Sequence, residues 1–326
     1  MRSPARLRGP CLLGICLGVA SAMAPRVADA RCDSNAALHA CVNADSLWLP
    51  ARRGSFLTLT NAETLAPGDV AFGSSASLSS KPIVLRVPSP GSHLEVPAVD
   101  KALHVSLSAS VGVATDWELA VIVPLTLYQS GAGVAPYLSS EADALPRTAL
   151  RDPRLGATYA LLARDLEDQG DGFALAAHLD LSLPLGNADA FASEPGPVLS
   201  PTVTADFRSG PLLVGAEAGA RLRTPTRFAN TRLGPQAVLA LGAGVDVLRE
   251  TLSLAVEAFA LPVLASQPSG GTLVPAEWMV TARTVPFADG AWAASLGGGT
   301  AIPLTEGAIT ASAWRAVLSI QYNTPP

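Results

Sequence analysis

Apolar and polar side chains alternate along residues 101–128. Every odd-numbered position is apolar in residues 103–113, and the same alternation resumes in residues 117–127 after the polar pair at 115–116. Side chains of a β-strand point to its two faces in turn, so this period predicts two antiparallel strands joined by a tight hairpin turn.

The length of each run indicates what surrounds the hairpin. A strand of a soluble protein is typically about five or six residues long. A strand that crosses a membrane needs ~9–11 residues, with apolar side chains outward and polar side chains inward. We therefore interpret the hairpin as one unit of a transmembrane β-barrel.

The alternation recurs along the rest of the chain. The predicted strands are 69–79, 103–113, 117–127, 155–161, 173–183, 199–208, 212–222, 234–247, 251–262, 274–285, 291–302 and 310–322. The longer connections, at 80–100, 129–151, 186–197, 224–233 and 263–273, follow odd-numbered strands, and the short ones tend to follow even-numbered strands. Outer-membrane barrels alternate short periplasmic turns with long extracellular loops in this way.

The fold class that we expect is all-β, a transmembrane antiparallel up-and-down β-barrel of about twelve strands. The barrel takes residues 68–322. A periplasmic N-terminal lead-in, 31–67, precedes it, and a C-terminal tail, 323–326, follows it. An even strand number places both chain termini on the periplasmic side.

Composition is consistent with this fold. The 326 residues are 49% hydrophobic and 15% charged, whereas soluble domains carry about 25% charged residues. Beyond the N-terminus, no apolar run approaches the ~18 residues of a membrane helix. The alternative is a soluble β-sandwich or an alanine-rich globular enzyme, and the strand lengths favour the barrel.

Residues 1–30 have the pattern of a cleaved signal peptide. A basic start containing Arg2 precedes an apolar stretch, and Ala28-Asp29-Ala30 provides a small-x-small cleavage site. Ala22-Met23-Ala24 is a poorer alternative because Pro25 follows it. Cleavage after Ala30 leaves 18 basic and 26 acidic residues, a net charge of −8 that disfavours nucleic-acid binding.

Cys32 and Cys41 are the two cysteines that remain after cleavage. In an oxidising exported compartment we expect them to form a disulfide. A metal site needs more ligands than these two and His39, and a lipid anchor on Cys32 needs small residues where Ala30 and Arg31 stand.

Charged side chains of the strands fall in the inward phase of the alternation. The predicted lumen-lining residues are Glu118, Arg154, His178, Asp180, Asp206, Arg208, Glu217, Arg221, Arg223, Asp246, Glu257, Glu277, Arg283 and Arg315. Such charges cost a few kcal/mol each when they face lipid at mid-depth. Two interpretations stay open: a pore lining that tunes solute selectivity, or a salt-bridged filling that closes a narrow barrel.

The residues of this sequence that could form a catalytic or phosphate-binding site are poorly placed for either role. His178, Asp180 and Ser182 share one face of one strand, where alternate residues are ~6.5 Å apart, but a triad needs contacts near ~3 Å from separate elements. Glycine runs at 242–244 and 297–299 lie within predicted strands and lack the following lysine of a phosphate loop. We expect no enzyme activity, no cofactor and no metal.

Several short motifs resemble the outer-membrane barrel of myxobacterial-type OmpA family proteins and related small transporter-like barrels. They are Glu63-Thr64-Leu65-Ala66-Pro67-Gly68, Val113-Ala114-Thr115-Asp116-Trp117-Glu118-Leu119, Val123-Pro124-Leu125, Asp152-Pro153-Arg154-Leu155-Gly156, and Leu183-Pro184-Leu185-Gly186 with Ala190-Phe191. The resemblance implies an outer-membrane barrel across most of residues 52–322. OmpA family members continue into a peptidoglycan-binding domain, and this sequence stops at Pro326, so we do not expect peptidoglycan tethering.

The function that we expect is a passive channel or transporter-like barrel for small solutes in the cell outer membrane. The alternative is a non-conducting structural or surface-interaction barrel, and a membrane-embedded lipid hydrolase that uses His178 ranks last. The expected partners are outer-membrane lipid, small solutes and the barrel-assembly machinery. We leave the oligomeric state open.

Overall fold

The computed structural model describes residues 39–52, 54–89, 92–134, 144–164, 171–248, 252–268, 270–284, 287, 291–305 and 309–324. The chain divides into a unit of residues 1–31 and a unit of residues 32–326. All described residues belong to the second unit. The predicted signal peptide and Cys32 lie outside the described residues.

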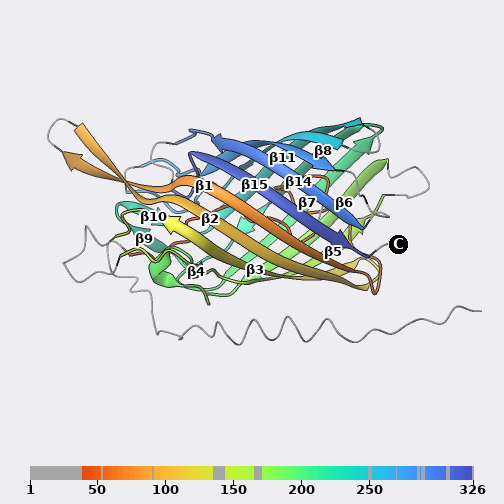
Figure 1. The fold of residues 1–326 in the computed structure, drawn as a ribbon, viewed down its shortest axis with the longest axis horizontal. Coiled ribbons are helices and arrows are strands. Elements are labelled where there is room, and N and C mark those ends of the chain that lie inside the picture. The colour runs from red at the N-terminus through yellow and green to blue at the C-terminus, as the bar shows by residue number, and fades with distance from the viewer. Residues whose placement is uncertain are drawn as a thin grey trace, which may run out of the picture. The chain divides into compact units, whose positions relative to one another are not determined.

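Antiparallel strands form a closed barrel of twelve strands (Figure 1). Each strand pairs with the next along the barrel, and β1 also pairs with β15, which closes the sheet. The barrel strands are β1 (Val70–Ser89), β2 (Ser92–Ala114), β3 (Trp117–Ser130), β5 (Arg154–Leu162), β6 (Gly172–Ser182), β7 (Val198–Ser209), β8 (Leu212–Arg221), β11 (Gln236–Leu248), β12 (Leu252–Ala260), β13 (Ala276–Thr284), β14 (Trp292–Ala301) and β15 (Trp314–Asn323).

The predicted fold class is therefore confirmed, because the period-two segments of the sequence form the strands of the barrel. The structure also contains short elements in the long connections. These are β4 (Ala149–Leu150), η3 (Ala188–Ala190), β9 (Thr226–Phe228) and β10 (Thr231–Leu233). Within the described ranges, no helix has both the length and the apolar character needed to cross a membrane.

One predicted loop is instead regular structure. The segment 80–100 was predicted to be a long loop with an extended piece at residues 83–87, but β1 and β2 continue through most of it and pair with each other, with Val84 opposite Pro97. Past Ser80 and Lys101 neither strand has a second neighbour, so the extension is a two-stranded ribbon of edge strands. Proline is tolerated at such edges because no ladder hydrogen bond is lost there. Figure 1 shows this ribbon in orange, projecting beyond the barrel.

Large apolar side chains cover the outer face of the barrel. In β3 the exposed residues Trp117, Leu119, Val121 and Val123 alternate with more buried neighbours. A soluble monomer rarely exposes so extended an apolar surface, whereas a membrane barrel needs an outward apolar band. The alternation thus matches a barrel surrounded by hydrocarbon.

Aromatic side chains mark both ends of this apolar band. At the short-turn end, Trp117 stacks near Tyr159 with 4.9 Å between ring centroids, and Trp292 lies 5.2 Å from Tyr322. Tyr128, Trp278 and Trp314 lie near the opposite strand ends and are exposed. Two aromatic girdles are typical of the two interfaces of a membrane.

The long connections pack together at the other end of the barrel. Their buried residues form an apolar cluster with Ala40, Val42 and Ala44, which lie near the start of the described part of the chain. The members from the strands and loops are Ile83, Leu85, Ala98, Val99, Ala102, Phe191, Phe228, Leu233, Val263, Leu273 and Ile309. The long-loop end is thus covered by packed side chains.

Substitution of Leu241 by arginine tests the membrane-facing surface. Leu241 lies mid-strand in β11 and is 66% exposed, so an arginine there faces hydrocarbon. We expect Leu241→Arg to lower the free energy of unfolding by ~2–4 kcal/mol, measured by urea denaturation in phospholipid vesicles. The control is Leu94→Arg in the exposed ribbon, expected within ~0.5 kcal/mol of the parent. Equal effects of both variants would contradict a lipid-facing Leu241.

Candidate functional site

Residues 39–65 occupy the interior of the barrel. We call them the luminal segment; residue 53 lies outside the described ranges. Phe56, Leu57 and Leu59 of this segment pack in one buried cluster with residues from β8, β11, β12, β13 and β15. The described part of the predicted periplasmic lead-in, 31–67, thus packs against the inner wall of the barrel, and the domain bounds stay a prediction.

The luminal segment runs through the barrel from the long-loop end to the short-turn end. Near its start, the amide of Ala44 donates to the carbonyl of Phe191, which lies in a long loop, at 2.9 Å. At the other end, the amide of Gly68 donates to the carbonyl of Gly112, beside the short turn of β2 and β3, at 2.8 Å. The chain then enters β1 at Val70. The described N-terminal residues thus lie at the long-loop end, opposite to the predicted periplasmic side.

Glu257 of β12 is the most heavily bonded of the wall carboxylates that contact the segment. It accepts from the amides of Leu57 at 3.0 Å and Thr58 at 2.7 Å, and from the Thr58 hydroxyl at 2.7 Å. Thr281 of β13 donates a further hydrogen bond at 2.7 Å. A buried carboxylate is costly unless several donors satisfy it, so Glu257 and the segment stabilise each other.

Two more wall glutamates bind the segment in the same way. Glu217 of β8 accepts from the amide of Thr60 at 2.6 Å. Glu118 of β3 accepts from the amide of Leu65 at 3.1 Å and forms an ion pair with Arg52 at 2.9 Å. The carboxylates on three separate sides of the barrel thus bind the backbone of one segment, which bends at residues 55–59.

The ring of Trp48 lies between two arginines of the lumen wall. The guanidinium carbons of Arg221 and Arg154 lie 4.2 and 4.8 Å from the ring centroid of Trp48, which is cation–π distance. The same arginines donate to the carbonyls of Ser46 at 2.8 Å and Leu49 at 3.0 Å. Each arginine therefore contacts the segment both at the Trp48 ring and at a backbone carbonyl.

Asp45 anchors the segment near the long-loop end. Its carboxylate lies 2.9 Å from Arg315 and 3.1 Å from Arg151, and Arg315 also pairs with Glu277 at 2.7 Å. All four side chains are buried. Removal of one partner from such a buried network leaves uncompensated charge and costs ~3–5 kcal/mol.

Glycines of the wall create room for the apolar side chains of the segment. A Cβ on Gly215 or Gly242 would lie 2.5 or 2.6 Å from the ring of Phe56, and a Cβ on Gly297 would lie 2.9 Å from Leu57. Because glycine has no Cβ, the strands form a notch into which the Phe56 ring fits. Gly215, Gly242 and Gly297 are therefore close-packing positions.

The structure places the fourteen predicted lumen residues on the inner side of the barrel or at its rim. Buried are Glu118, Arg154, His178, Asp206, Glu217, Arg221, Glu257, Glu277, Arg283 and Arg315, and half-buried are Asp180, Arg208, Arg223 and Asp246. Asp206 pairs with Arg164, Arg208 with Asp246 at 3.6 Å, and Arg223 with Glu194 at 2.8 Å.

Sequence reasoning missed several partners of these charges. Asp45, Trp48 and Arg52 lie in the luminal segment, and Arg151 and Arg164 lie in connections. Two pairs join residues that were both predicted, Arg208 with Asp246 and Arg315 with Glu277. The signal that could have pointed to further partners is the number of charged side chains that the alternation directs into a twelve-stranded barrel, because buried charges need partners.

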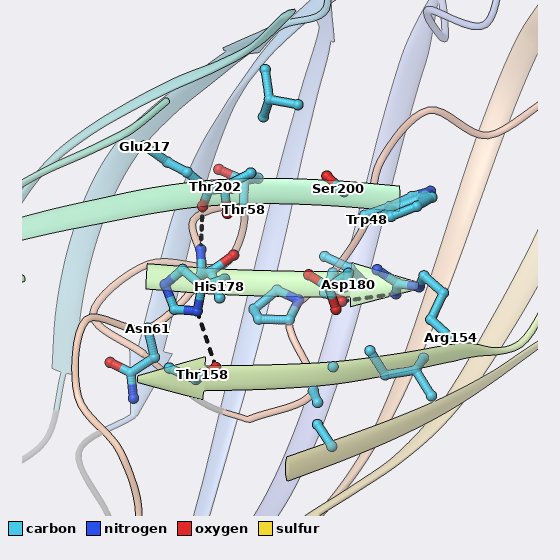
Figure 2. A pocket seen from close by; sticks show the side chains of 18 of the residues that line it. Trp48, Thr58, Asn61, Arg154, Thr158, His178, Asp180, Ser200, Thr202 and Glu217 are labelled. Carbon is cyan, nitrogen blue, oxygen red and sulfur yellow. Dashed lines mark hydrogen bonds between the residues drawn. The ribbon is translucent and has the colours of Figure 1, made fainter. Parts of the chain in front are cut away.

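Little space remains around the segment. Figure 2 shows the cavity between His178, Asp180, Arg154 and Trp48. Its volume is ≈ 70 Å³, which admits only a few water molecules. Small-molecule pockets typically have ~300–1,000 Å³, so this cavity is too small for a sugar or amino acid while the segment is in place.

His178 does not form a catalytic triad in this cavity. Its Nδ1 lies 3.0 Å from the hydroxyl of Thr158, and its strand neighbour Leu179 faces outward. The imidazole is thus directed to the lumen and away from lipid. Among the described residues, no group of three or more histidine, cysteine, aspartate or glutamate side chains could hold a metal ion.

Two of the sequence motifs meet at one buried carboxylate outside the strands. Asp152 accepts from the amides of Gly186 at 2.9 Å and Glu194 at 2.8 Å, and from the hydroxyl of Ser193 at 2.7 Å. Burial raises the pKa of Asp152, and these hydrogen bonds oppose that rise. The contacts fix two long connections to each other where Arg151 reaches Asp45.

Cys41 is disulfide-bonded. It lies at the start of the luminal segment and is buried. Its pairing with Cys32 stays a prediction, because Cys32 is not among the described residues.

No protein-family model matches the chain, and no curated protein matches it. A crystal structure of an outer membrane channel from Pseudomonas putida F1 is similar at 13% sequence identity and a TM-score of 0.58, over 82% of this chain and 100% of that chain. The NanC porin has 8% identity and a TM-score of 0.47, over 77% and 98%. The KdgM porin has 9% identity and a TM-score of 0.44, over 78% and 98%. At 13% identity, the similarity to the channel from Pseudomonas putida F1 shows only the fold, which is a β-barrel of the outer-membrane type.

Substitution of Glu257 by glutamine tests the main anchor of the segment. The amide group of glutamine carries no charge and presents donors where Leu57 and Thr58 also donate, so these contacts weaken. Hydrogen bonds to charged groups contribute ~1.5–3 kcal/mol, and we expect the amides of Leu57 and Thr58 to exchange with deuterium at least about tenfold faster in Glu257→Gln. Mass spectrometry of the detergent-solubilised protein measures the rates. Glu95→Gln, in the exposed ribbon, should leave them unchanged, and unchanged rates in both variants would contradict the assigned role.

Proposed function

We propose that the protein is a passive channel for small solutes in the cell outer membrane. The observation that carries the proposal is a closed barrel with an apolar outer face and a charged, polar inner wall. A polar interior of this kind is typical of barrels that conduct water and solutes. Similarity in fold to the outer membrane channel from Pseudomonas putida F1 supports the same function.

Conduction in this proposal requires the luminal segment to move. With the segment in place, the cavity beside Trp48 and His178 is ≈ 70 Å³. The segment is held by hydrogen bonds, ion pairs and cation–π contacts to the wall, and it is covalently joined to β1. We therefore propose a gated channel in which displacement of the segment opens the lumen.

A second candidate is a non-conducting structural or surface-interaction barrel. The specific observation in its favour is the filled lumen, in which Glu257, Glu217 and Glu118 all bind the segment. Under this function the segment is a permanent core, and the exposed ribbon of β1 and β2 carries the interaction with other molecules.

We further propose that the protein is not an enzyme. A lipid hydrolase needs its nucleophile and base on the lipid side, whereas His178 faces the lumen and is bonded to Thr158. The short sequence motifs resemble barrels of the OmpA family, and membership of that family stays a prediction. Export through a cleaved signal peptide and assembly by the barrel-assembly machinery remain part of the proposal.

Weakening the anchors at the long-loop end tests gating. In the full chain, Asp45→Asn with Trp48→Ala removes the charge between Arg315 and Arg151 and the ring between Arg154 and Arg221, and changes no wall residue. Because each buried anchor contributes on the order of a few kcal/mol, we expect current through planar bilayers to be at least about tenfold more frequent than for the parent. Adding Arg221→Glu should then change the reversal potential in a salt gradient.

The control for this experiment is Glu95→Gln, which removes an exposed ion pair with Arg86 outside the lumen and should conduct like the parent. A double variant that folds, as shown by heat-modifiable gel migration, yet never conducts would favour the structural function.

A further inference from the structure

The lumen wall holds the luminal segment mainly through its backbone. Carboxylates of the wall accept from its amides, and guanidinium and hydroxyl groups of the wall donate to its carbonyls. The amide donors are Leu57 and Thr58 to Glu257, Thr60 to Glu217, and Leu65 to Glu118. The carbonyl acceptors are Ser46 for Arg221, Leu49 for Arg154, Ala51 for Ser108, and Gly54 for Arg283.

Side-chain recognition adds to these backbone contacts. The Phe56 ring occupies the notch at Gly215 and Gly242, Leu57 and Leu59 pack in the same buried cluster, and the Thr58 hydroxyl donates to Glu257. Trp48 lies between two arginines, and the side chains of Asp45, Arg52 and Ser55 also bond to the barrel. Only the amide and carbonyl contacts use groups that every polypeptide carries.

From this arrangement we infer that the lumen is a binding site for oligopeptides that carry large apolar side chains and bend as residues 55–59 do, and that peptides are a solute class of the channel. The inference rests on the proposed function. When the luminal segment is displaced, its backbone partners on the wall lose their hydrogen bonds, which is costly for buried charged groups. A second peptide of this kind supplies the same amides and carbonyls, and its apolar residues fill the places left by Phe56, Leu57 and Leu59.

An oligosaccharide does not replace these contacts equally well. Its hydroxyl groups can donate and accept, but it has no apolar ring for the glycine notch and no amide that points to Glu257 and Glu217 in succession. The wall therefore discriminates by its contacts with peptide amides and carbonyls and by apolar contacts.

Binding of a labelled peptide to the full-chain Asp45→Asn/Trp48→Ala variant tests the inference. The probe is a fluorescent peptide with the sequence of residues 54–61, blocked at both ends so that terminal charges play no part. We expect fluorescence anisotropy in detergent to show binding at least tenfold tighter to this variant than to the parent protein, in which the segment competes. Because anisotropy does not depend on ion current, a protein that binds peptide but never conducts would contradict the channel and not the peptide site.

Backbone methylation provides the matched control peptide. Methyl groups on the amides that correspond to Leu57, Thr58 and Thr60 remove the donors and leave every side chain in place. We expect this peptide to bind at least tenfold more weakly. A peptide that keeps the phenylalanine and both leucines, and has serine at the two threonine positions and alanine or serine elsewhere, should bind within about threefold of the original, and addition of Glu257→Gln should weaken both.

Three results would overturn the inference. These are equal binding of the methylated and unmethylated peptides, loss of binding by the alanine-serine peptide, and equal competition by a maltooligosaccharide of similar length. If the double variant does not fold, Phe56→Ser with Leu59→Ser in the full chain displaces the segment by removing its apolar contacts instead, and the same comparisons apply.

Discussion

Buried charge in the barrel interior must find a partner, and this constraint determines how the interior is organised. A side chain such as Glu257 cannot stay ionised in a narrow lumen without donors, because desolvation of an unpaired carboxylate costs many kcal/mol. Neighbouring strands provide part of the compensation, as Glu277 does for Arg315. The luminal segment provides the rest through its amides, its carbonyls and the charges of Asp45 and Arg52.

Much of the barrel could be predicted from the sequence because strand periodicity is a local property. One face of each strand contacts hydrocarbon and the other contacts polar groups. A run such as 173–183 can therefore be assigned as a strand, with its outward and inward faces, from its own residues alone. The ribbon at 80–100 was predicted only in part, as an extended piece at 83–87, for the converse reason. Its prolines lie on strands with a single neighbour, and whether a strand is an edge is decided by residues that are distant in sequence.

The luminal segment could not be predicted because its order is not periodic. Leu47-Trp48-Leu49-Pro50 and Phe56-Leu57-Thr58-Leu59 stand out as apolar contacts in the sequence, yet no alternation indicates where they pack. Their positions depend on the notch at Gly242, on the arginines 154 and 221, and on Glu257. Those groups come from strands that are about one to two hundred residues away, so only the assembled barrel places them together.

The covalent connection of the segment to β1 explains how many modest contacts can keep the lumen filled. A ligand that is tethered through Gly68 to the wall acts at an effective concentration of about millimolar or above, so it competes strongly with any free solute. Its other end lies near Asp45, Arg315 and Arg151, whereas the end near Glu118 is next to the first strand. In the proposed gating, release begins at the long-loop end, where buried ion pairs and the Trp48 contacts are concentrated. The distribution of anchors along the segment thus places the strongest charge contacts at the end from which the lumen would open.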